Sequence, residues 1–223
     1  MRAVTPVKRQ LILLRHGQTE YNATERMQGQ LDTDLTELGR TQAKSAAELL
    51  ATRSPMRIVS SDLRRALDTA TALGDASGVP VDVDQRLRET HLGDWQGLTH
   101  HDVDDLLPGA RSAWRADATV APPGGESRVD VARRSVPVVR ELLDSEMQWG
   151  ADGASAPIVL VAHGGLIAAL SAALLDLPVD RWPVLGGLSN TSWVQLSSHG
   201  EGDALGWRLD VWNASARVAS DVL

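Results

Sequence analysis

Short apolar runs alternate with longer amphipathic stretches along most of this chain. Residues 11–14 and 157–162 are almost wholly apolar and have the length of a strand. Such runs are typical of strands that are buried on both faces of a sheet. Shorter runs of the same kind predict further strands at 57–61, 79–83, 190–196 and 207–212.

The stretches between these strands carry apolar residues at helical spacing and predict helices at 36–50, 63–73, 127–148 and 166–175. Thr36 and Asp62 are expected to cap the first two, because their side-chain oxygens can accept hydrogen bonds from the free amides of a first turn. Pro137 predicts a bend or a break in the third helix, since an interior proline removes a backbone hydrogen bond.

The alternation of strands and helices predicts an α/β fold, a three-layer α/β/α sandwich with a mostly parallel sheet. The last two strands are expected to lie antiparallel at one edge. Residues 98–126 are the least regular part, with two short helical patterns and a Pro-Gly-rich end. We interpret them as a small helical cap inserted in a single domain of residues 1–223, because no linker or second core is evident.

Composition narrows the classes of protein to be considered. The net charge of −7 argues against nucleic acid as a partner, so any anion site has to be local. The chain has no cysteine, and no apolar run long enough to span a membrane or to act as a signal peptide. We therefore expect a cytoplasmic protein that binds neither nucleic acid nor membrane.

Both buried strands end in a histidine followed by glycine, as Arg15-His16-Gly and as His163-Gly164. Arg65 opens the helix that follows the strand at 57–61. The carboxyl ends of parallel strands meet at one edge of a sheet, so these side chains are expected to lie together. Four cations or potential cations in one small volume need an anion, and arginine matches phosphate oxygens bidentately. One such motif alone can simply cap a strand, whereas its recurrence favours a phosphate site.

Several motifs resemble those of the histidine phosphatase superfamily, the relatives of phosphoglycerate mutase, over residues 11–198. The first is Leu14-Arg15-His16-Gly17-Gln18-Thr19-x-x-Asn22, together with the later Ala162-His163-Gly164. A Ser-x-Leu-x-Arg-Ala-x-x-Thr-Ala motif places its arginine at Arg65. A Leu-x-Glu-x-x-x-Gly-x-Trp-x-Gly motif places its acid at Glu89.

This resemblance implies a phosphatase mechanism. His16 would attack phosphorus and form a phosphohistidine, while Arg15, Arg65 and His163 hold the phosphate oxygens. Glu89 would protonate the leaving group and later take a proton from water. No metal and no cofactor is required, and a homodimer is expected from the relatives. Further substrate-binding positions are Asn22, Gln28 and Gly164, and the loop at 17–34 would form the rim of the site with Arg26, Gln28, Gly29 and Gln30.

The motifs favour a phosphatase over a mutase. In the mutases a His-Tyr-Gly segment follows the acid and an asparagine follows the late His-Gly, whereas this chain has Thr90-His91-Leu92-Gly93 and Gly165. Four longer stretches resemble a branch of the family that acts on glucosyl-3-phosphoglycerate, releasing glucosylglycerate early in methylglucose lipopolysaccharide biosynthesis. They are residues 27–33, 60–66, 89–100 and 211–216. A broad-specificity phosphatase or a 2,3-bisphosphoglycerate-dependent mutase is the alternative.

Two other classes of function are less favoured. A metal-dependent hydrolase could use His16, His163 and Glu89 as ligands, but Arg15 and Arg65 would repel a divalent ion. A noncatalytic phosphate sensor would not need both a nucleophile and an acid. Two interpretations are open for five residues of the cap. They could contact the part of the substrate that is not phosphate, or they could form an ordinary exposed surface. These residues are His100, His101, Arg111, Trp114 and Arg115.

Overall fold

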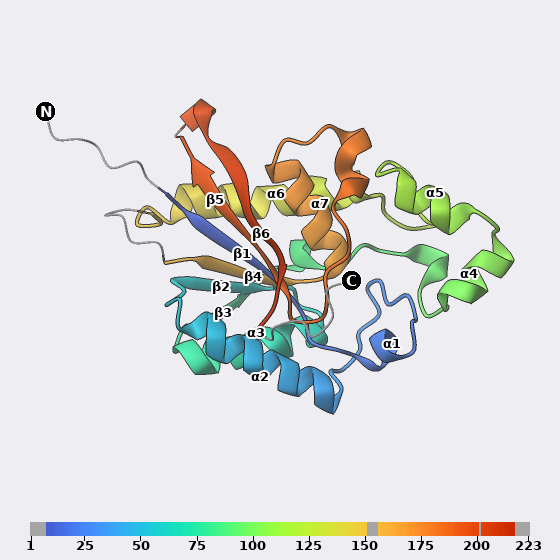
Figure 1. Cartoon of the computed structure of the whole chain (residues 1–223), viewed down its shortest axis with the longest axis horizontal. Coiled ribbons are helices and arrows are strands. Elements are labelled where there is room, and N and C mark those ends of the chain that lie inside the picture. Colours follow the sequence, from blue (N-terminus) through green and yellow to red (C-terminus); the bar gives the residue numbers. More distant parts are fainter. Residues whose placement is uncertain (1–7, 151–155, 201, 217–223) are drawn as a thin grey trace, which may run out of the picture.

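A six-stranded sheet runs through the middle of the computed structural model, which describes residues 8–150, 156–200 and 202–216 (Figure 1). The spatial order of the strands is β3-β2-β4-β1-β5-β6. Their bounds are β1 Gln10–Arg15, β2 Arg57–Ser60, β3 Val81–Val83, β4 Ile158–Ala162, β5 Trp193–His199 and β6 Gly206–Ala214.

Four of these strands are parallel and two are not. β2 pairs in parallel with β3 and β4, and β4 with β1. β5 runs antiparallel to β1, and β6 antiparallel to β5. The predicted α/β sandwich with one antiparallel edge is therefore confirmed.

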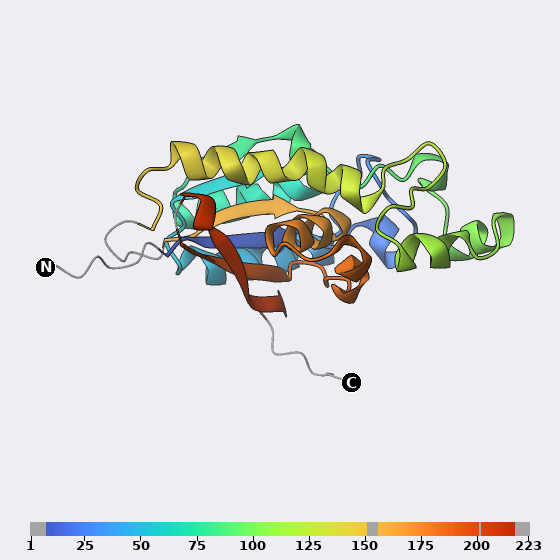
Figure 2. The same cartoon turned by 90° about the horizontal axis from the view of Figure 1, so that it is seen from above.

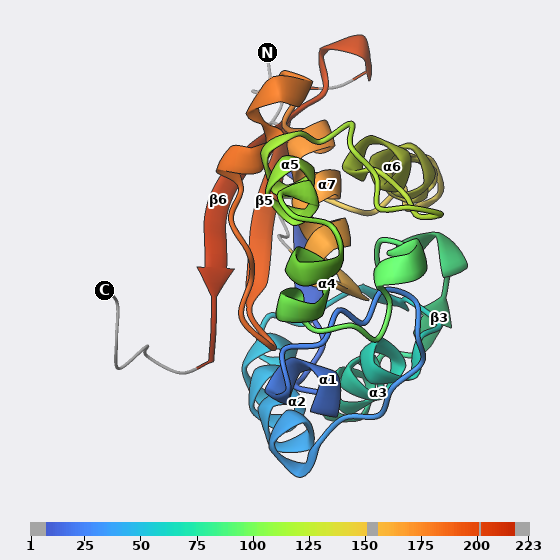
Figure 3. The same ribbon diagram turned by 90° about the vertical axis from the view of Figure 1, so that its right-hand side faces the viewer.

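Helices cover both faces of the sheet (Figures 2 and 3). Alternate side chains of β1 show which helices lie on which face. Leu11 and Leu13 belong to the apolar cluster that contains residues of α6 and α7, whereas Ile12 and Leu14 pack with α2 and α3. The helices are α1 Glu20–Ala23, α2 Glu37–Ala51, α3 Arg64–Ser77, α4 His100–Leu106, α5 Ala110–Ala116, α6 Arg128–Ser145 and α7 Gly164–Leu174.

The predicted N-caps have different outcomes. Thr36 caps α2, because its Oγ1 accepts a hydrogen bond from the Gly39 amide at 3.0 Å. The prediction for Asp62 was wrong, since its carboxylate pairs with Arg88, whose Nε lies 2.7 Å from Oδ1. A distant residue, Asp32, instead accepts from the backbone amide of Arg64 at the start of α3.

The long helix α6 begins where the sequence predicts. Ser127 caps it by accepting from the Asp130 amide at 3.2 Å, and the helix continues through Pro137, so a break is not found and a bend stays a prediction. Reciprocal hydrogen bonds from Ser127 to the Asp130 carboxylate complete the capping box, which stabilises the first turn.

The short helices α4 and α5 lie beyond one end of the sheet, in the region where the parallel strands end (Figure 2). A small apolar cluster of Met27, Leu92, Trp95 and Val103 joins this cap to the loops beneath it. No helix in the described ranges is long and apolar enough to cross a membrane.

Candidate active site

Two neighbouring parallel strands place two histidines side by side. Arg15 and Ala162 are paired in the register of β1 and β4, so His16 and His163 each follow at the carboxyl end of their strands. Their ring centroids lie 5.1 Å apart at an interplanar angle of 57°. Both side chains are buried, at 2% and 0% exposure.

Hydrogen bonding fixes the tautomer of His16. Its Nδ1 lies 2.7 Å from the carbonyl oxygen of Gly17, and because a carbonyl only accepts, Nδ1 carries the proton. The lone pair is then on Nε2. Burial holds the pKa of His16 well below its usual 6.5, and the charges of Arg65 and Arg15 lower it further. His16 is therefore a neutral nucleophile at neutral pH.

Arg65 is fully buried and anchors the loop that precedes α2. Its two terminal nitrogens donate to the carbonyls of Leu31 and Gly29, each at 2.7 Å. Burial lowers the pKa of Arg65 to about 10, although Glu89 and Asp32 oppose this shift. The guanidinium thus stays charged at neutral pH and is held in one orientation.

Several buried nitrogens around the two histidines have no hydrogen-bond partner in the described part of the chain. They are Nε of Arg15, Nε of Arg65 and both ring nitrogens of His163. Arg15 is itself held by donation to the Leu188 carbonyl. Burial lowers the pKa of Arg15, and burial followed by the charge of Arg65 lowers that of His163 far below 6.5. An acceptor-rich ligand would pair with the two Nε–H groups and with the one ring nitrogen of His163 that carries a proton, because unpaired buried donors are destabilising.

Backbone amides at the start of α7 hold the carboxylate of Glu89. Its Oε1 accepts from the amides of Thr90 at 2.7 Å and Leu166 at 3.0 Å, and its Oε2 accepts from Gly165 at 3.1 Å. A helix N-terminus favours negative charge at this position. The negative charge also raises the pKa of Arg15 and Arg65, in partial opposition to burial.

These groups meet at a cavity of about 230 Å³. His16, Glu89 and both predicted arginines line it, and so do Asn22 and Gln28, whereas His163 and Gly164 are not among its lining residues. The amide oxygen of Asn22 accepts from Asn190 at 3.1 Å, and that of Gln28 accepts from Thr33 at 2.8 Å. Their amide nitrogens are thus the atoms left to bind a ligand.

The cap contributes three of the five residues considered from the sequence. His100, Trp114 and Arg115 line the cavity. His101 does not, since its side chain is 83% exposed and lies 2.9 Å from Asp105. Arg111 is paired with Asp104 and does not line it either.

Some lining residues were missed from the sequence, namely Met27, Thr90, Leu92 and Gly165. They are apolar or small, and Gly165 reaches the site through its backbone amide, so none carries a chemical signal of its own. The rim residues Arg26 and Gly29 do line the cavity, while Gln30 instead donates to the backbone carbonyl of Glu89 at 3.0 Å.

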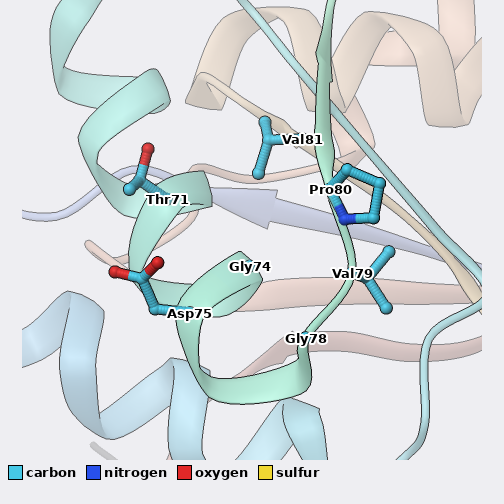
Figure 4. Close-up of a pocket in the computed structure, with 7 residues that line it drawn as sticks. All are labelled: Thr71, Gly74, Asp75, Gly78, Val79, Pro80 and Val81. Atoms are coloured by element: carbon cyan, nitrogen blue, oxygen red, sulfur yellow. The ribbon is translucent and has the colours of Figure 1, made fainter.

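A larger hollow of about 530 Å³ lies between the end of α3 and β3 (Figure 4). Asp75 is the single titratable side chain among its lining residues, and no basic side chain that could bind a phosphate is among them. It is lined by Thr71, Gly74, Asp75, Gly78, Val79, Pro80 and Val81.

Comparison with known proteins identifies relatives along most of the chain. The chain is 68% identical to the glucosyl-3-phosphoglycerate phosphatase of Mycolicibacterium vanbaalenii, over 96% of this chain and 99% of the relative. It is 67% identical to the enzyme of the same name from Mycobacterium tuberculosis, with the same two coverages.

Solved structures agree with this result. The structure of a mycobacterial glucosyl-3-phosphoglycerate phosphatase in complex with VO3 superimposes with a TM-score of 0.91 at 68% identity. The match covers 93% of this chain and all of that one. The model of the histidine phosphatase superfamily (branch 1) matches residues 11–215. The chain therefore belongs to the histidine phosphatase superfamily.

Proposed function

We propose that this protein is a phosphomonoesterase that releases phosphate from glucosyl-3-phosphoglycerate through a phosphohistidine on His16. The observation that carries the chemistry is the group of buried, unpartnered nitrogens of Arg15, Arg65 and His163 beside that nucleophile. Three oxygens of a phosphoryl group would supply the missing acceptors. The substrate is proposed from relatives at 67–68% identity that carry the corresponding name.

Binding comes first in this mechanism. The guanidinium groups of Arg15 and Arg65 and the ring of His163 hold the phosphoryl oxygens, and the amide nitrogens of Asn22 and Gln28 add further donors. Because the arginine side chains are already fixed by backbone carbonyls, little reorganisation is needed when phosphate enters.

Phosphoryl transfer follows. The Nε2 lone pair of His16 forms a bond to phosphorus while the bond from phosphorus to the ester oxygen breaks. Charge spreads over the equatorial oxygens, where the two arginines stabilise it. The phosphomonoester enters as its monoanion, and its remaining proton passes to Glu89, the single carboxylate among the residues lining the cavity. Glu89 then gives this proton to the departing alkoxide.

Hydrolysis of the phosphohistidine restores the enzyme. Water enters on the side that the alcohol has left, and Glu89 accepts one of its protons as oxygen bonds to phosphorus. The bond between phosphorus and Nε2 then breaks and inorganic phosphate is released. His16 regains its lone pair, with Nδ1 still donating to the carbonyl of Gly17.

Charge stabilisation by arginine takes the place that a divalent ion has in other phosphoryl transfers. In the described ranges no three His, Asp or Glu side chains are grouped so that they could hold one metal ion.

The test is phosphate release in the presence of excess chelator, from glucosyl-3-phosphoglycerate, 3-phosphoglycerate and an aryl phosphate. We expect a kcat/KM for the glucosylated substrate far above the other two. Equal values would instead indicate a broad-specificity phosphatase, and loss of all activity on chelation would indicate a metal enzyme. Formation of 2-phosphoglycerate from 3-phosphoglycerate and 2,3-bisphosphoglycerate would indicate a mutase.

We also propose a single domain with residues 98–126 as its cap, a homodimer, and a cytoplasmic location. One family model that matches residues 11–215 supports the first. Light scattering of the purified protein tests the dimer, for which a mass close to twice 23.9 kDa is expected.

A further inference from the structure

The cavity has two unlike ends. Around His16 it is lined by the phosphate-binding side chains, whereas the other end is made by the cap and the apolar side chains of Met27 and Leu92. Trp114 and Arg115 of α5 belong to this second end. A phosphoryl group bound at the first end would direct the rest of its ester toward them.

Trp114 is held in place from two sides. Its ring centroid lies 5.8 Å from that of Trp95 in an edge-to-face arrangement of 86°, and the guanidinium of Arg128 lies 5.5 Å from the Trp114 ring. The Nε1 of Trp114 is buried and has no acceptor among the described residues. Trp114 is thus a fixed apolar wall with one unsatisfied donor.

Arg115 differs from the other arginine of its helix. Arg111 is committed to Asp104, with Nε 3.0 Å from Oδ1. No ion pair or hydrogen bond of the Arg115 guanidinium is found within the described ranges. The charged groups near it are two further basic side chains, Arg128 and His100, and the carboxylate of Asp104, which Arg111 already binds. The net charge of the chain is −7, so a guanidinium without an ion pair, beside other cations at a cavity, is a local exception. Such a group is suited to bind an anionic part of a ligand.

We propose that Trp114 and Arg115 select the leaving group of the substrate. Trp114 packs against a sugar ring and donates its indole N–H to a hydroxyl oxygen, and Arg115 pairs with a carboxylate. This inference rests on the proposed phosphatase function and assigns its specificity to two positions of the cap. In this proposal Trp114 recognises the sugar ring, and Arg115 recognises the carboxylate, which is the second negative group of the substrate after the phosphate.

Three substrates test the two roles independently. Glucosyl-3-phosphoglycerate has the ring and the carboxylate, 3-phosphoglycerate has the carboxylate alone, and glycerol 3-phosphate has neither. We expect Trp114→Ala to lower kcat/KM for the first about tenfold or more, with less than about a twofold change for the other two. Trp114→Phe, which keeps a ring and removes the N–H, should lose about threefold.

Arg115→Ala should lower kcat/KM about tenfold for both carboxylate-bearing substrates and leave glycerol 3-phosphate unchanged. Its matched control is Arg111→Ala, which removes the same charge from the same helix one turn away. The control should keep the wild-type order of the three substrates, with each kcat/KM within about twofold of wild type.

Each role can be overturned separately. If Trp114→Ala lowers kcat/KM equally for all three substrates, the side chain supports the cavity and does not recognise the ring. If Arg115→Ala leaves the ratio of 3-phosphoglycerate to glycerol 3-phosphate unchanged, it does not bind the carboxylate. If the wild-type enzyme has the same kcat/KM for glucosyl-3-phosphoglycerate and 3-phosphoglycerate, both the proposed substrate and the role of Trp114 are refuted. The ratio of kcat/KM between 3-phosphoglycerate and glycerol 3-phosphate would still test the role of Arg115.

Discussion

The two ends of the cavity are built in opposite ways. The phosphate-binding end comprises Arg15, His16, Arg65, Glu89 and His163. Backbone groups of loops and of the start of α7 hold the first four of these side chains. Two of its side chains, those of Arg65 and His163, have no exposed area. The cap end stands on two helices of seven residues each, and Arg115 there is exposed.

This difference separates chemistry from selection. Every phosphomonoester presents the same phosphoryl group, so a rigid site serves all of them and lowers the cost of reorganisation. The alcohol differs from one ester to the next, and short surface elements can change their side chains without disturbing a buried core. Variants at the phosphate-binding end should therefore lower the turnover of all substrates. Variants in the cap should lower the turnover of some substrates and leave that of others unchanged.

The strongest test of the phosphate-binding end is removal of the nucleophile. We expect His16→Ala to lower kcat at least about 10⁴-fold for every phosphomonoester, because no other group takes over the covalent step. Rapid acid-free quenching with labelled substrate should trap a phosphoenzyme in wild type and none in the variant. Circular dichroism serves as the control for folding. Substantial activity in a folded variant would contradict the phosphohistidine mechanism.

Glu89→Gln should have the next largest effect. Without a proton donor, turnover of a sugar phosphate is expected to fall about 10²- to 10³-fold. An activated aryl phosphate should lose far less, because its leaving group departs without protonation. Unlike His16→Ala, this change should distinguish substrates by their leaving group. Equal losses on both would remove Glu89 from the role of acid.

Two adjacent glycines offer a matched pair of smaller changes. A Cβ at Gly165 would lie 2.6 Å from Oε1 of Glu89, whereas one at Gly164 would lie 3.6 Å from Nε of Arg15, an ordinary contact. We expect Gly165→Ala to displace the carboxylate and lower kcat for sugar phosphates about tenfold or more. Gly164→Ala should stay within about threefold of wild type. The reverse order would show that Glu89 is not positioned by close contact with α7.

The smallest expected effect is on stability as a function of pH. Burial keeps the pKa of His16 and His163 far below 6.5 in the folded chain, while the unfolded chain binds protons near pH 6.5. Acidification through this range therefore favours unfolding, by about 1 kcal/mol for each histidine between pH 7 and 5.5. Carboxylates titrate mainly at lower pH.

Urea denaturation at these two pH values measures the difference. His163→Ala should reduce the loss of stability on acidification by about 1 kcal/mol relative to wild type. His101→Ala in the cap, where the side chain is 83% exposed, should leave the loss unchanged. An identical loss in wild type and His163→Ala would mean that this ring is protonated in the folded protein.

Sequence patterns were most informative at the phosphate-binding end. The placement of Arg15, His16 and His163 depends only on where a buried strand ends, which is a local property of the sequence. The interpretation failed where a partner is distant in sequence. Asp62 was expected to cap a helix, but Arg88, 26 residues later, binds its carboxylate more strongly than an amide would.

The cap could be predicted only in outline. Two short helices were expected and are present, but the sequence alone did not distinguish Arg111 from Arg115. Which arginine faces the cavity depends on the rotation of α5, and that is fixed by the pairing with Asp104 and the packing of Trp114.

The parallel pairing of β1 with β4 has one more consequence. The separation of His16 and His163 follows from the spacing between hydrogen-bonded strands, about 4.8 Å in any sheet. This spacing is set by hydrogen bonds of the polypeptide backbone, and it does not depend on the surrounding side chains. A related protein that keeps these two strands adjacent can therefore have a different cap and a different substrate. The distance between the nucleophile, His16, and His163 would stay the same.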